Sequence, residues 1–161
     1  MQRWPSGCST FPPDHGGQGL LKVAGGTFTA QNNVYSGVEG NGTIEIGPAG
    51  KLAITKDLVL SNAVESAYTR YSTLRFELGQ DGCGLIDLKG AMQVESGAKL
   101  YVDATAYWHA KRVQLIKSTK LADCAWFADG DVTLLGGDVR LIRDANGLWF
   151  KRNVGAVLLV R

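Results

Sequence analysis

Apolar and polar residues alternate along most of this chain from Leu20 onward, in short runs separated by turn residues. Runs such as TIEI, KLAI, TLRFEL and KLYV place an aliphatic or aromatic side chain at every second position. Because successive side chains of a β-strand point to opposite faces, this period of two predicts strands. Clusters such as GPAG, NNVYSG and DANG separate the runs and predict turns. We therefore expect an all-β chain of about a dozen strands.

No window of ten or more residues has a helical period. The segment SNAVESAYTRYS, residues 61–72, is the best candidate for a helical turn or a loop excursion, because Tyr68 and Tyr71 would share one face of a helix. Three of the four prolines, Pro5, Pro12 and Pro13, precede Leu20 and predict an irregular arm over residues 1–19.

One strand–turn–strand unit occurs twice: GTIEIGPAGKLAI at residues 42–54 aligns without a gap with GAMQVESGAKLYV at residues 90–102. Each coil of a solenoid needs the same inward apolar positions and tight corners as the coil on which it stacks. This repeat therefore favours a parallel β-solenoid, which forms a single domain over residues 20–161. An antiparallel β-sandwich is the alternative. The unit predicts inward apolar pairs and outward polar pairs; these are Ile44/Met92, Ile46/Val94, Leu52/Leu100 and Ile54/Val102 inward, with Glu45/Gln93 and Lys51/Lys99 outward.

The composition of the 161 residues is that of a folded protein, with 45% hydrophobic and 20% charged residues. The net charge of +2 is too balanced to indicate a nucleic acid or an anionic membrane as the partner. The part from Lys111 onward is mildly basic, which predicts either a solvated face or a basic glycan-binding face. No run approaches the ~20 apolar residues of a transmembrane helix, and residues 1–19 lack the apolar core of a signal peptide.

The stretch GLLKVAGGTFTAQNNVYSGVEGNGTIEI, residues 19–46, combines a lysine-containing strand, the strand GGTFTA, an asparagine turn and VYSG. This order resembles the autotransporter-associated repeat of bacterial surface proteins. The later STLRFELGQDGCGLIDLKGAMQVESGAKLYVDA is similar to the region that follows such repeats. The resemblance spans most of residues 19–152 and implies a right-handed parallel β-helix that is secreted or displayed on a bacterial cell surface. It implies no catalytic residue, and the chain has fewer repeats than passenger domains of that family.

Aromatic residues suggest one candidate binding site, at Tyr107, Trp108 and His109. Exposed aromatic rings stack on the apolar faces of sugars, and a neighbouring polar group can select an orientation. Strand alternation offers another interpretation, in which one ring packs inward and the other faces solvent. The other histidine, His15, follows Asp14 in the irregular arm, where a working dyad is not expected.

Carboxylates suggest a second site, because Asp129, Asp131 and Asp138 lie in a glycine-rich region and could bind calcium through oxygen ligands. They could equally form turns by bonding to nearby backbone. No other cofactor is indicated. Asp81 and Asp87 flank Cys83, and their spacing does not require them to pair.

The three cysteines, Cys8, Cys83 and Cys124, have no metal-binding spacing. One disulfide with one free thiol, or three reduced thiols, are both consistent with the sequence.

No motif of a known catalytic class occurs. The leading interpretation is therefore a secreted or cell-surface module for binding, adhesion or structural presentation, with a glycan or glycoprotein as partner. The alternative is an extracellular hydrolase, either an acid peptidase or a glycan-cleaving enzyme, that uses a carboxylate pair. A third interpretation is a structural part of a larger passenger, with solenoid ends that make end-to-end or homo-oligomeric contacts.

Overall fold

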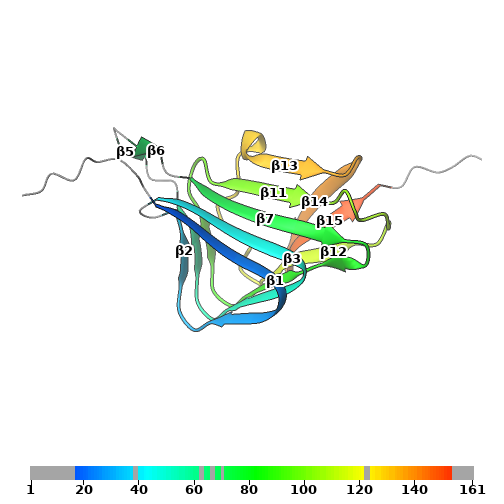
Figure 1. Ribbon diagram of the computed structural model, residues 1–161, viewed down its shortest axis with the longest axis horizontal. Coiled ribbons are helices and arrows are strands. Elements are labelled where there is room, and N and C mark those ends of the chain that lie inside the picture. Colours follow the sequence, from blue (N-terminus) through cyan, green and yellow to red (C-terminus); the bar gives the residue numbers. More distant parts are fainter. Residues whose placement is uncertain are drawn as a thin grey trace, which may run out of the picture.

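The protein is an all-β solenoid, drawn as a ribbon in Figure 1. The computed structural model describes residues 17–37, 40–61, 64–65, 68–69, 71–121 and 124–153. Strands hold 61% of the chain and helices 3%, so the all-β prediction is confirmed. Parallel strands stack in about 3 turns, which confirms the solenoid and not the antiparallel sandwich.

The described chain contains fifteen strands and the short 3₁₀ helix Asp129–Asp131. In chain order they are β1 (Gln18–Ala30), β2 (Val34–Ser36), β3 (Asn41–Ile54), β4 (Leu58–Leu60), β5 (Val64–Glu65), β6 (Tyr68–Thr69), β7 (Ser72–Gly79), β8 (Gly82–Cys83), β9 (Leu85–Leu88), β10 (Met92–Val94), β11 (Lys99–Asp103), β12 (Val113–Lys117), the 3₁₀ helix Asp129–Asp131, β13 (Val132–Leu135), β14 (Val139–Asp144) and β15 (Gly147–Arg152).

Three sheets form the walls of the solenoid. Sheet 1 consists of residues 18–23 of β1, residues 41–46 of β3, β7, β11 and β13, all parallel. Sheet 2 consists of residues 25–30 of β1, residues 49–54 of β3, β9 and β12, followed by the antiparallel strands β15 and β14. Sheet 3 consists of β2, β4 and β10. β1 and β3 are longer than predicted because each runs through the corner from sheet 1 to sheet 2.

Apolar side chains of successive coils stack in rows that fill the interior. In sheet 2, Leu52, Ile86 and Ile116 lie in register and are each 0% exposed. Phe28 occupies the same row in the first coil but is 48% exposed, because no further described strand covers it. Side-chain burial in this row therefore depends on having a coil on both sides.

The two copies of the repeated unit do not stack on one another, so that part of the prediction is wrong. Ile44 in sheet 1 stacks on Leu74, whereas its counterpart Met92 lies in sheet 3 and stacks on Leu58. The first copy runs from sheet 1 to sheet 2, whereas the second runs from sheet 3 to sheet 1. Both copies cross a glycine-containing corner between two apolar strands, at Gly47 and Gly50 in the first copy and at Gly97 in the second, so the pattern recurs at different walls. All the predicted inward residues are nevertheless buried.

Close approach of coils at the corner between sheets 1 and 2 requires glycine. A Cβ atom on Gly84 would lie 2.2 Å from the Gly47 carbonyl oxygen and 2.3 Å from that of Gly50. At the corner leading to sheet 3, side chains join the coils instead. The Asn33 side chain accepts the backbone N–H of Asp57 at 3.1 Å, and the Asp57 carboxylate accepts the backbone N–H of Ala91 at 2.8 Å. These bonds account for the asparagine turn seen in the sequence.

The segment with a weak helical pattern is an excursion from the solenoid. β5 and β6 pair antiparallel, so the described part of residues 61–72 is a hairpin and not a helix. The apolar run AVLLV, residues 156–160, which the sequence pattern also predicts to be a strand, lies outside the described residues, as does the arm over residues 1–16. β1 begins at Gln18, just before the predicted start of the domain at Leu20.

Candidate functional site

Tyr107, the first residue of the predicted aromatic site, is an anchor inside the protein. Its side chain is 1% exposed and packs edge to face against Phe150 of β15, with ring centroids 6.0 Å apart. The hydroxyl donates to the Lys111 carbonyl at 2.8 Å, and the backbone N–H donates to the Ala104 carbonyl at 3.0 Å. Burial raises the pKa of the Tyr107 hydroxyl, which therefore remains a donor at neutral pH. These contacts hold both ends of the loop that connects β11 to β12.

Trp108 projects from this loop into solvent and is 68% exposed. The guanidinium of Arg152 lies over its ring, 4.5 Å from the centroid, and Arg152 also donates to the Tyr107 carbonyl. His109 is exposed and contacts the edge of the Tyr107 ring, with centroids 5.6 Å apart. One ring therefore packs inward and the other faces solvent, as the alternation-based interpretation expects.

Arg152 belongs to this cluster, and the sequence reasoning missed it. It comes from β15, 45 residues after Tyr107, and reaches the loop because β15 pairs with β12. Strand alternation shows that Arg152 shares a face with the buried Phe150. The sequence therefore indicated the face on which Arg152 lies, but its contact with Trp108 could be predicted only from the pairing of β15 with β12.

The predicted calcium ligands are not gathered into a cluster. Asp129 and Asp131 belong to the 3₁₀ helix, and Asp138 precedes β14, where its carboxylate accepts the Asn153 side chain at 3.2 Å. Among the described residues, no group of three or more His, Cys, Asp and Glu side chains could hold a metal ion. Nothing in this part of the chain supports the calcium prediction.

Cys83 and Cys124 are both free thiols, and Cys8 lies outside the described residues, as do Asp14 and His15. Burial raises the pKa of Cys83 to about 12, so this thiol stays protonated and unreactive at neutral pH.

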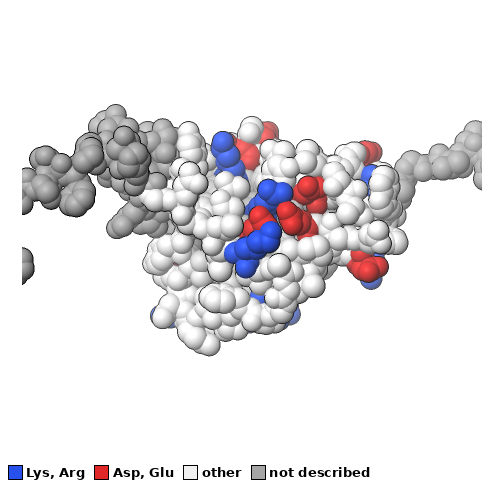
Figure 2. All heavy atoms as spheres, in the orientation of Figure 1, with Lys and Arg blue, Asp and Glu red and all other residues white. Residues whose placement is uncertain are grey.

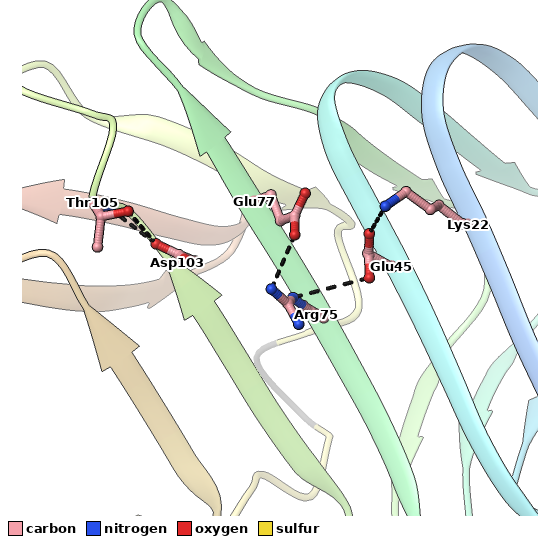
Figure 3. Close-up of polar contacts among 6 residues, drawn as sticks. All are labelled: Lys22, Glu45, Arg75, Glu77, Asp103 and Thr105. Carbon is pink, nitrogen blue, oxygen red and sulfur yellow. Dashed lines mark hydrogen bonds and ion pairs between the residues drawn. The ribbon is translucent and has the colours of Figure 1, made fainter.

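Carboxylates and cations alternate on the outer face of sheet 1, which faces the viewer in Figure 2. Figure 3 shows Glu45 between Lys22 and Arg75, and Arg75 in turn between Glu45 and Glu77. The Arg75 Nη2 atom lies 3.0 Å from Glu77, and its Nε atom lies 4.0 Å from Glu45. Glu45 is only 8% exposed although it points outward, and its hydrogen bond and charge raise the pKa of Lys22. Each carboxylate here is balanced by a cation.

The hydrolase alternative needs a carboxyl whose pKa is raised, so that it can act as an acid. Three described carboxyls have a shifted pKa, and in each the direction is downward. Hydrogen bonds from Thr105 lower the pKa of Asp103. Burial alone would raise the pKa of Asp87, but hydrogen bonds and charges of Lys89 and Lys51 lower this pKa by more than burial raises it. Asp87 faces these lysines, not Asp81, so no observation on the described chain favours the hydrolase.

An open groove of about 1040 Å³ lies at the first coil, between β1, β2 and the start of β3. Its lining mixes glycine with Leu21, Val34 and Ile44, and Tyr35 is the one titratable side chain among the described residues that line it. It lies at the other end of the solenoid from Trp108.

Comparison with known proteins identifies no relative: no family model, no curated protein and no solved structure matches the chain. Within the described residues, no helix has both the length and the apolar character to cross a membrane.

Proposed function

We propose that this chain is a binding module of a secreted or cell-surface protein, and that it holds a glycan against Trp108. The observation that carries the proposal is a large aromatic side chain that is 68% exposed on a loop fixed by buried contacts. A ring held in place loses little conformational entropy when a ligand binds. The resemblance to autotransporter-associated repeats supports the extracellular location.

The indole of Trp108 has one face covered by Arg152, and the exposed fraction of the side chain leaves the other face to solvent. That face suits the C–H groups of a pyranose ring. His109 follows Trp108 in the chain and is exposed, so its imidazole can hydrogen-bond to the hydroxyls of a sugar stacked on this face. An apolar platform flanked by a few polar groups is the usual composition of a small-ligand site.

A glycan array identifies a ligand, and isothermal titration then measures its affinity for the full chain and two variants. Trp108→Ala removes the platform and is expected to lower affinity roughly 5- to 150-fold, on the scale of the about 1–3 kcal/mol that stacking of a base on an aromatic side chain contributes. Tyr35→Ala is the matched control, because Tyr35 is 59% exposed on β2. Equal affinities for the two variants, or no glycan bound at all, would contradict the proposal.

A further inference from the structure

Positive charge gathers on the outer face of sheet 2. On sheet 1 the outward charges balance, with Lys22, Arg75 and Lys99 against Glu45, Glu77 and Asp103. On sheet 2 and its edges they do not: the carboxylates are Asp87, Asp138 and Asp144, and the cations are Lys51, Lys89, Arg112, Lys117, Arg140 and Lys151. A chain whose net charge is only +2 thus has one basic wall.

A row of cations crosses the C-terminal strands on this wall. Arg140 of β14 lies directly opposite Lys151 of β15 in the antiparallel register. Arg112 comes next, because it precedes Val113, which pairs with Phe150. Neighbouring strands are about 4.8 Å apart. Like charges directly opposite one another on a sheet are destabilising, so this arrangement favours an anion that bridges them.

The three carboxylates of the wall already have partners, and that of Asp138 accepts the Asn153 side chain at 3.2 Å. Asp87 lies 3.0 Å from Lys89 and 3.4 Å from Lys51. Asp144 forms an ion pair with Arg112 and accepts the Trp149 indole N–H at 3.0 Å. Among the described residues, no carboxylate forms an ion pair with Arg140, Lys151 or Lys117, which are left to bind an external anion.

We propose that the outer face of sheet 2 binds an acidic polysaccharide, one with a carboxylate or sulfate on its repeating sugar. Arg140, Lys151 and Lys117 pair with the anionic groups. The sugar hydroxyls donate to Asp87 and Asp144. A polymer of phosphates alone has no such donors, and its negative charges would be repelled by these two carboxylates. DNA carries one charge per about 1.7 Å of its axis, a density that this mixed wall does not match.

This surface is separate from Trp108, because Arg140 and Lys151 face away from the buried side of β15 that carries Phe150 and Arg152. The proposal therefore goes beyond the glycan contact at Trp108, and either can fail without the other. The ligand class also differs: Trp108 stacks on a sugar ring of any charge, whereas the basic wall requires an anion.

The test is titration of the full chain with polygalacturonate, with neutral dextran and with a short DNA duplex, at low and high salt. Polygalacturonate is expected to bind, more weakly at high salt because salt screens exposed charges. The double variant Arg140→Gln/Lys151→Gln is expected to lose roughly tenfold or more in affinity, since a hydrogen bond to a charged group contributes about 1.5–3 kcal/mol. The same loss is expected when the double variant is made in a Trp108→Ala background, which removes any sugar contact at Trp108.

Lys99→Gln/Lys120→Gln is the control, because it removes the same net charge from exposed lysines away from the row. Its affinity is expected to stay within about twofold of the parent, since distant exposed charges are screened. Equal losses for the two double variants would overturn the proposal, because net charge alone would then explain binding. Tighter binding of DNA or dextran than of polygalacturonate, or no binding of polygalacturonate, would overturn it as well.

Discussion

The stacked row Phe28, Leu52, Ile86 and Ile116 predicts that one apolar substitution has different costs at different levels of the solenoid. Ile86 has a coil on each side and is 0% exposed, whereas Phe28 is 48% exposed at the first coil. Ile86→Ala deletes buried methyl groups and leaves a cavity enclosed by neighbouring coils. Such a change lowers the free energy of unfolding by about 2–5 kcal/mol, and we expect a value near 3.

Phe28→Ala deletes a larger side chain but leaves no enclosed cavity. Full burial of a phenylalanine side chain contributes about 3 kcal/mol at most. With about half of the side chain in solvent, the loss is expected to be about 1.5 kcal/mol. The larger deletion should therefore have the smaller effect.

Urea unfolding followed by circular dichroism measures both variants, with Ile116→Ala as a second buried comparison. We expect Ile86→Ala and Ile116→Ala to have a much lower free energy of unfolding than the parent. The value for Phe28→Ala is expected to lie between theirs and that of the parent. If Phe28→Ala were as destabilising as Ile86→Ala, the first coil would be covered in solution and the stacking argument would be refuted at that level.

Other predictions concern the corner, the charges and the thiol. Gly84→Ala is expected to lower stability by more than about 2 kcal/mol, because the added Cβ would meet two backbone oxygens; urea unfolding measures the loss. The pKa of Asp87 is lower in the folded chain than its unfolded value of 3.8. The ionised carboxylate therefore stabilises the folded chain fully above pH 3.8, and this stabilisation is lost as the pH falls through the folded-state pKa. Asp87→Asn should therefore reduce the loss of stability between about pH 5 and pH 2, and an unchanged pH profile would contradict the ion pairs with Lys51 and Lys89. Cys83 should react with a thiol reagent at pH 8 far more slowly in the folded chain than after unfolding, because its folded-state pKa is about 12; equal rates would contradict the raised pKa.

The strands could be predicted from the sequence because alternation is a local property. In β7 (Ser72–Gly79), buried and part-buried residues alternate without a break, and the run TLRFEL already shows this period. The neighbours of each strand could not be predicted in the same way. Ile44 and Met92 obey one local pattern but lie in different walls, since the pattern describes a passage around a glycine-containing corner and not a level of the solenoid.

The candidate site shows the same limit. Trp108 could be proposed from its residue type, but its partner Arg152 depends on the pairing of β15 with β12. The cation row was closer to prediction. The DANG turn at residues 144–147 sets the hairpin register, and that register places Arg140 opposite Lys151. Arg112 joins them only through a further sheet pairing, which is a long-range property.

Both proposed surfaces depend on the level-by-level stacking of the coils, which disulfide trapping tests most directly. In a chain whose native cysteines are replaced by alanine, Thr43→Cys/Thr73→Cys places thiols on directly paired residues of β3 and β7. Adjacent strands are about 4.8 Å apart, within the range that a disulfide spans. Thr43→Cys/Ala91→Cys places them on positions that match only in the sequence repeat. The account predicts that mild oxidation closes the first pair and not the second; closure of the second pair alone would contradict it.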